Sequence, residues 1–211
     1  MTDARRLIVL AAGLLVAGTL AGLLVEGNGF DGSLVRSVAA DRTAGLTDAE
    51  RLVTQLGELW LDAAFAGVVL GLVVVGRRRD ALFVLVAAGG AMILTNAIKV
   101  IVERPRPGGG GLVSVASASW PSGHATSSIA FYGALGLLAA RWVSRGWGRG
   151  AIWVVVGVLV AAVGTSRVYL GVHYPSDVVA GWLVGGLWLA GVLRVLGADG
   201  PGVTGARGKG T

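Results

Sequence analysis

Long apolar runs recur along the sequence and are separated by short polar stretches. A helix needs about 20 residues to cross the hydrocarbon core of a bilayer, and the runs approach or reach that length. The pattern therefore predicts six transmembrane helices, with ends defined only to within several residues. The predicted spans are about Leu7 to Val25, Leu59 to Val75, Ala81 to Val102, Ala125 to Val143, Ala151 to Gly164 and Val178 to Leu196.

The first predicted span follows Arg5 and Arg6, a start that also fits a secretory signal peptide. Its apolar run is longer than the core of a signal peptide, which holds about 7 to 15 residues. No clear cleavage site follows it. We therefore expect a retained membrane anchor.

Composition supports a membrane protein, because 54% of the 211 residues are hydrophobic and only 14% are charged. The length fits one domain. The chain has no cysteine, which excludes disulfides and thiolate metal sites. The net charge of +6 does not indicate a nucleic-acid partner, because most basic residues flank apolar runs instead of forming one solvent-exposed face.

The distribution of Lys and Arg predicts the orientation, since basic residues concentrate in cytoplasmic loops. With the N-terminus inside, both termini and the tail 197–211 are cytoplasmic, and residues 26–51 form an outer loop with an interfacial helix. The cytoplasmic set is then Arg5, Arg6, Arg77, Arg78, Arg79, Arg141, Arg145, Arg149, Arg194, Arg207 and Lys209. The outer set is Arg36, Arg42, Arg51, Lys99, Arg104, Arg106 and Arg167.

Two polar clusters interrupt the middle of the chain on the predicted outer side. In "KVIVERPRP", Lys99 and Arg106 either anchor a helix end at the interface or bind a phosphate group. In "PSGH", Ser122 and Gly123 lead into His124 at the start of the fourth span. This is either a helix cap beside a surface histidine, or an anion site built from free N–H groups and the Ser122 hydroxyl.

A third cluster, "SRVYLGVHYPSD", joins the last two predicted spans. Pro175 suits a first helical turn, so we expect Asp177 to fold back toward the imidazole of His173. A carboxylate on one ring nitrogen fixes the tautomer and leaves the other nitrogen free to attack. Asp177 as a helix cap and His173 as an interfacial residue is the alternative. Both histidines of the chain fall on one predicted membrane face, which favours a single site.

Together the clusters resemble the signature of the PAP2 (type 2 phosphatidic acid phosphatase) superfamily. That signature is Lys-x6-Arg-Pro, then Pro-Ser-Gly-His, then Ser-Arg-x5-His-x3-Asp, and every position is filled. The resemblance implies an all-α fold, a six-transmembrane-helix bundle of the PAP2 and haloperoxidase-like type. It also implies a single integral membrane domain over residues 1–211 with its motif core at 99–177.

The resemblance implies a metal-independent phosphatase that needs no cofactor. His173 is then the nucleophile, Asp177 orients it, and His124 protonates the leaving oxygen. The expected phosphate-binding residues are Lys99, Arg106, Ser122, Gly123, Ser166 and Arg167.

The expected substrate is a lipid phosphate or diphosphate held in the bilayer and cleaved at the outer face of a bacterial inner membrane. Undecaprenyl diphosphate is preferred, with phosphatidylglycerol phosphate or phosphatidic acid as alternatives. Vanadium haloperoxidases share the constellation, but six spans argue against them. A non-catalytic lipid-phosphate binder or transporter is the alternative of another class, and the intact motifs favour catalysis. The residues predict no oligomeric state.

Overall fold

The computed structural model describes residues 2–25, 29–57, 59–108, 111–113 and 115–197. Within these ranges the regular secondary structure is helical throughout, which confirms the all-α prediction. The elements are α1 (Asp3–Val25), α2 (Gly29–Ala40), α3 (Ala44–Gln55), α4 (Leu59–Val74), α5 (Arg78–Val84), the π-helical segment η1 (Leu85–Gly89), α6 (Gly90–Val102), α7 (Gly123–Ala140), α8 (Gly146–Tyr169) and α9 (Pro175–Leu196). The predicted tail 197–211 lies outside the described residues beyond Gly197.

Each of the six predicted spans coincides with a helix or a continuous series of helices. Among the described residues, four segments are long and apolar enough to cross a membrane: α1, the run from α5 through α6, α8 and α9. The apolar part of α4 is shorter, at Leu61–Val74. Helix α7 opens with a polar turn at residues 123–128, which lowers its apolar character. The six-span topology therefore stays a prediction.

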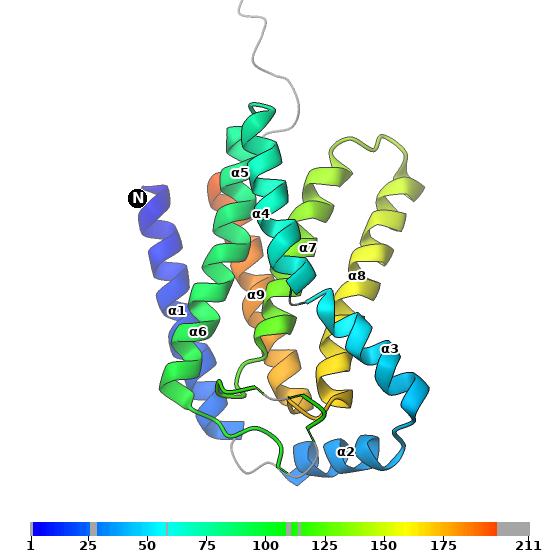
Figure 1. Ribbon diagram of the computed structural model, residues 1–211. Coiled ribbons are helices and arrows are strands. Elements are labelled where there is room, and N and C mark those ends of the chain that lie inside the picture. The colour runs from blue at the N-terminus through cyan, green and yellow to red at the C-terminus, as the bar shows by residue number, and fades with distance from the viewer. Residues whose placement is uncertain (1, 26–28, 58, 109–110, 114, 198–211) are drawn as a thin grey trace, which may run out of the picture.

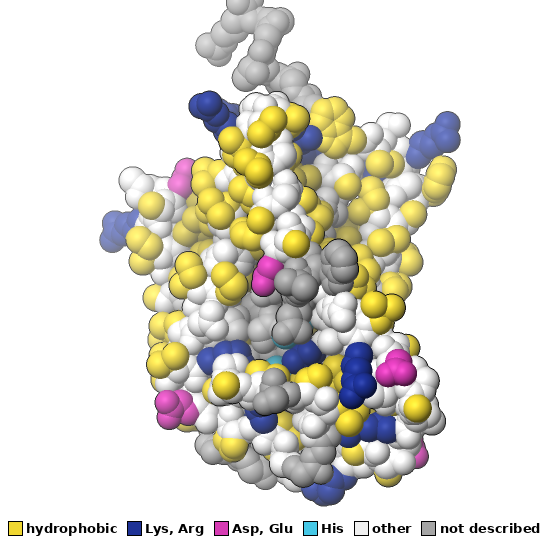
Figure 2. Space-filling model, viewed as in Figure 1, with side chains coloured by type: hydrophobic (Ala, Val, Ile, Leu, Met, Phe, Trp, Pro, Cys, Tyr) yellow, Lys and Arg dark blue, Asp and Glu magenta, His cyan; other side chains and the backbone are white. Residues whose placement is uncertain are grey.

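Helix α7 lies inside the bundle and packs against α8, α9 and α6 (Figure 1). Its core positions Ala130, Phe131 and Ala134 are fully buried. The outer faces of the bundle are apolar as well, with exposed side chains such as Ile93 and Val154 (Figure 2). Large exposed apolar surfaces of this kind mark contact with a membrane or partner.

Glycines allow α9 to approach α7 closely. A Cβ atom on Gly181 would lie 2.6 Å from the carbonyl oxygen of Ser122, and one on Gly185 would lie 2.6 Å from that of Thr126. The two glycines are four residues apart, the spacing typical of close helix contacts in membranes. This contact brings the first turn of α9 beside the first turn of α7.

The predicted outer loop contains two helices instead of one. Helix α2 lies across the end of the bundle where α6 and α8 end and where α7 and α9 begin, and α3 runs obliquely toward α4 (Figure 1). The three polar clusters therefore come together at one end of the bundle. The opposite end carries the start of α1 and the turns between α4 and α5 and between α7 and α8.

Candidate active site

His173 lies in the turn between α8 and α9 and is almost completely buried. Its Nδ1 atom is 3.3 Å from Oδ2 of Asp177, in the first turn of α9. The same carboxylate oxygen accepts hydrogen bonds from the Ser119 hydroxyl at 2.5 Å and from the Tyr174 backbone N–H at 2.8 Å. These donors hold Oδ2 beside the imidazole.

The other ring nitrogen of His173 faces a cation. Nε2 is 3.1 Å from an Nη1 atom of Arg106. A guanidinium group has donors and no acceptor, so this contact requires a lone pair on Nε2 and the ring proton on Nδ1. Nδ1–H then donates a hydrogen bond to Asp177, and the lone pair of the ring is on Nε2.

The electrostatic environment keeps this imidazole neutral. Burial lowers the pKa of His173 to about 4, although the hydrogen bond and charge of Asp177 act in the opposite direction. The positive charges of Arg106 and Lys99 lower the pKa further. His173 therefore carries an available lone pair at neutral pH.

Three cations of the motifs gather around this histidine. Lys99, near the end of α6, donates to the carbonyl oxygens of Ala118 and Ser119. Arg106 donates to the carbonyl oxygen of Val172 at 2.6 Å. Arg106 and Arg167 both lie close enough to Lys99 to act on it electrostatically. Such a concentration of positive charge attracts a phosphate group.

Arg167 projects from α8 and is 2% exposed. One of its Nη atoms donates to the Thr54 hydroxyl at 2.5 Å. Thr54 lies near the end of α3, so this helix supports a cation of the third motif. Ser166 is also buried, and its hydroxyl donates to the carbonyl oxygen of Val163 within α8. The Ser166 hydroxyl proton is therefore used in a hydrogen bond within α8.

The start of α7 contributes the "PSGH" residues. Ser122 is the N-cap residue, yet its side chain makes no capping bond, and its buried hydroxyl has no hydrogen-bond partner among the described residues. Its backbone N–H donates to the Asp177 carbonyl oxygen at 2.9 Å. A Cβ atom on Gly123 would lie 3.9 Å from Cε of Lys99, which brings this helix start beside the cations.

His124 occupies the first turn of α7 and is partly buried. The groups that act on it electrostatically are Arg167, His173, Arg106 and Lys99. The two histidines and the three cations of the motifs therefore share one site. Figure 2 shows Lys, Arg and His side chains gathered below the apolar part of the bundle on this face.

Sequence reasoning missed three polar residues of the site. Ser119 has a hydroxyl bond to Asp177, and Arg104 donates to the other oxygen of the same carboxylate at 2.6 Å. Arg104 also donates to Asp31 of α2 at 2.8 Å. The position of Arg104 beside Arg106 in "ERPRP" was a possible signal. Asp31 had none, because its partner is distant in the sequence.

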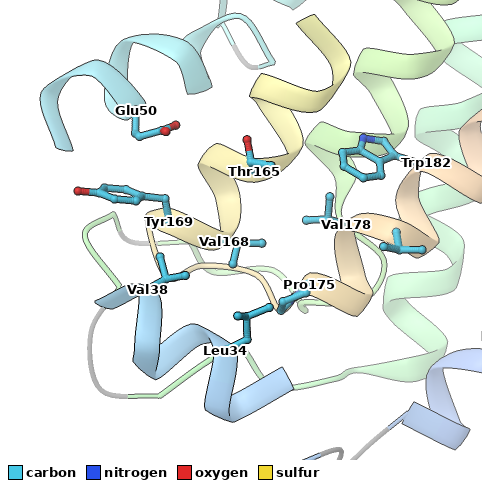
Figure 3. A pocket seen from close by; sticks show the side chains of 10 residues that line it. Leu34, Val38, Glu50, Thr165, Val168, Tyr169, Pro175, Val178 and Trp182 are labelled. Atoms are coloured by element: carbon cyan, nitrogen blue, oxygen red, sulfur yellow. The ribbon is translucent and has the colours of Figure 1, made fainter. Parts of the chain in front are cut away.

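An apolar cavity of about 370 Å³ lies on another flank, between α2, α3, α8 and α9 (Figure 3). Leu34 and Val38 line it from α2, and Tyr169 and Trp182 line it from α8 and α9. The expected phosphate-binding residues are not among the described residues that line it. The charged site is therefore distinct from this cavity.

The sequence and the fold are similar to those of known phosphatases. The sequence model of the PAP2 superfamily matches residues 80–200, and the chain belongs to this superfamily. It is 35% identical to decaprenylphosphoryl-5-phosphoribose phosphatase of Mycobacterium tuberculosis over 161 residues, which cover 72% of this chain and 80% of that protein. It is 28% identical to phosphatidylglycerophosphatase B of Bacillus subtilis over 170 residues, which cover 70% and 83% of the two chains.

A solved structure supports the same assignment. The crystal structure of a transmembrane PAP2-type phosphatidylglycerolphosphate phosphatase from Bacillus subtilis superposes with a TM-score of 0.77 at 25% identity. The match covers 87% of this chain and 94% of that one. The protein is thus a membrane protein and a phosphatase of the PAP2 type, as the motifs predict.

Proposed function

We propose that this protein is a metal-independent phosphatase that hydrolyses a lipid phosphate or diphosphate through a phosphohistidine intermediate. The observation that carries the proposal is the buried His173, with Nδ1 at Asp177 Oδ2 and Nε2 toward Arg106. This arrangement directs a lone pair at a position surrounded by cations. A neutral, oriented imidazole in such a position is a competent nucleophile toward phosphorus.

In the first step, Nε2 of His173 forms a bond to phosphorus, and the bond from phosphorus to the leaving oxygen breaks. His124 gives a proton to that oxygen. Asp177 stabilises the positive charge that the ring gains, and Arg106 moves its hydrogen bond from Nε2 to a phosphoryl oxygen. Lys99 and Arg167 balance the remaining charge of the phosphoryl group, which is the main catalytic contribution expected in phosphoryl transfer.

In the second step, a water molecule attacks phosphorus and passes a proton to His124. The bond between phosphorus and Nε2 breaks, inorganic phosphate leaves, and His173 returns to its neutral form. His124 thus acts first as an acid and then as a base, which restores both histidines after each turnover.

The proposed topology has six spans, both termini in the cytoplasm and the site at the outer face of a bacterial inner membrane. It rests on the distribution of basic residues and on the gathering of the polar clusters at the end opposite the start of α1. A reporter fused after Arg79 or Arg149 is expected to read cytoplasmic, and one inserted in residues 108–111 external. The reverse pattern would contradict the outer site.

The preferred substrate is undecaprenyl diphosphate. The mycobacterial relative, named as a phosphatase of a decaprenylphosphoryl compound, supports a polyprenyl lipid. Phosphatidylglycerol phosphate, supported by the Bacillus subtilis relative, and phosphatidic acid are the alternatives. In each case the tail stays in the bilayer while the head group reaches the charged site.

The decisive experiment is phosphate release by purified protein in detergent with EDTA, over a panel of these lipids. We expect turnover with chelator present, highest on the polyprenyl diphosphate, and its loss in a His173→Ala variant. Loss of turnover on chelation, restored by one divalent ion, would overturn the metal-independent mechanism. Binding of the lipids without phosphate release would favour the non-catalytic binder or transporter.

A further inference from the structure

Arg104 is a buried cation that the proposed chemistry does not use. Its side chain is 4% exposed and lies between two carboxylates. One Nη atom donates to Asp177 Oδ1 at 2.6 Å, and the other donates to Asp31 Oδ2 at 2.8 Å. The guanidinium also lies over the Tyr174 ring, 4.3 Å from its centroid. Arg104 is therefore held in one orientation by groups on three sides.

Asp31 holds the side of the Arg104 guanidinium that faces away from Asp177. It projects from α2, and its side chain is 2% exposed. Besides Arg104, it accepts from the Ser176 hydroxyl and, at 3.2 Å, from the Ser176 backbone N–H. Ser176 immediately precedes Asp177 in the first turn of α9. Helix α2 is thus bonded both to Arg104 and to the turn that carries the Asp177 carboxylate.

The two carboxylate oxygens of Asp177 have different hydrogen-bond partners. Oδ2 receives Ser119, Tyr174 and the His173 ring, whereas the Arg104 guanidinium bonds Oδ1. The terminal torsion of an aspartate side chain is broad and roughly two-fold, so a carboxylate bonded on one edge can still turn. A charge-assisted bond on the opposite edge prevents that rotation.

We propose that Arg104 is a positioning residue for the hydrolysis, and that Asp31 positions Arg104. Arg104 acts through Asp177, by keeping Oδ2 in line with Nδ1 of His173 and so keeping the lone pair on Nε2. The inference rests on the proposed function. It adds a buried chain of hydrogen-bonded side chains from α2 to the nucleophile, in the order Asp31, Arg104, Asp177 and His173.

A buried ion pair can also contribute to folding stability alone. The test therefore needs a kinetic measurement that a change in folding stability does not affect. Arg104→Gln is expected to lower kcat by about 10²-fold, the cost of a slightly misplaced reacting group, with a smaller change in KM. Asp31→Asn is expected to lower kcat less, since Arg104 stays in place. Arg42→Gln is the matched control, because Arg42 precedes α3 and donates to the Tyr169 carbonyl oxygen at the end of α8, at 2.8 Å.

The deciding comparison is a double-mutant cycle with Asp177→Asn, measured on an activated phosphate ester. If Arg104 acts through Asp177, adding Arg104→Gln to Asp177→Asn changes kcat by less than about threefold, because coupled residues are not additive. Independent losses that multiply would overturn the inference. Thermal unfolding in detergent accompanies each variant, and Asp31→Asn replaces Arg104→Gln in the cycle if the latter does not fold.

Failure of the inference and failure of the proposed function give different results. A wild-type protein without phosphate release on any lipid phosphate contradicts the proposed function. Two results with an active wild-type protein contradict only the role of Arg104. In one, the losses of kcat from Arg104→Gln and from Asp177→Asn multiply in the double mutant. In the other, the Arg42→Gln control loses as much kcat as Arg104→Gln.

Discussion

Replacing Asp177 by asparagine is the sharpest perturbation that the site offers, because it changes one oxygen to an amide and preserves volume. In the native site both carboxylate oxygens accept hydrogen bonds, from Arg104 on one side and from Ser119, Tyr174 N–H and His173 on the other. An amide has one acceptor and one donor end. Either orientation therefore places its NH₂ group against a donor.

The more favourable orientation keeps the amide oxygen at Arg104, because a hydrogen bond from the charged guanidinium is stronger than one from the Tyr174 backbone N–H. The NH₂ group then faces Nδ1 of His173, which must give up its proton and become the acceptor. The proton moves to Nε2, and the lone pair required for attack is lost. In hydrolytic triads the same exchange lowers kcat by about 10⁴-fold. At about 1.36 kcal/mol per tenfold, this corresponds to about 5 kcal/mol of transition-state stabilisation.

The assay is phosphate release by Asp177→Asn and wild-type protein at matched concentration, together with mass spectrometry of a phosphorylated His173. We expect a loss of about 10³- to 10⁴-fold in kcat and no accumulation of the phosphohistidine. Thermal unfolding in detergent serves as the control for folding. A folded variant that loses less than tenfold would refute the tautomer argument and the role of Asp177.

Three further predictions follow from the geometry. His124→Ala is expected to lose about 10²- to 10⁴-fold on a lipid substrate and much less on a nitrophenyl ester, whose leaving oxygen needs little protonation; equal losses would leave His124 as a phosphate ligand. The chain has two histidines, so ¹⁵N-histidine NMR of His124→Gln reports His173 alone. Because its lowered pKa keeps the ring neutral down to about 4, we expect an Nδ1–H tautomer that protonates only as the pH falls through that value, and titration near 6.5 would refute this. Gly185→Ala places a Cβ 2.6 Å from the Thr126 carbonyl oxygen and is expected to destabilise by about 1 to 3 kcal/mol in thermal unfolding, whereas Gly157→Ala, with nothing within 4 Å, is not.

Contacts between residues close in sequence were predictable before the fold was known. His173 and Asp177 are four residues apart at a helix start, and the first turn brings their side chains together wherever the helix lies. The same reasoning applies to the helix start at "PSGH". The apolar runs likewise predict helices, because their lengths match the thickness of a bilayer.

Ser166 illustrates the limit of a motif. The resemblance implies that Ser166 binds phosphate, but its hydroxyl donates to the carbonyl oxygen of Val163 in the same helix. A sequence pattern names the residue type and leaves the rotamer to the local backbone. Serine hydroxyls in helices often bond to a preceding carbonyl, which competes with any ligand.

The apolar pattern and the three motifs were enough to predict the all-α class, a membrane protein of this superfamily and the residues proposed to bind phosphate. The packing of the helices was needed to show that α7 lies inside the bundle, that α2 crosses its end, and that Arg104 joins Asp31 to Asp177. The bonds of Arg104 to Asp31 and to Asp177 each span 73 residues of the chain. Such pairs depend on how whole helices pack, and packing energies are summed over many side chains instead of being encoded in a local spacing. Local motifs therefore predicted the proposed reacting groups, whereas the contacts that hold them in place follow from the packing of distant helices.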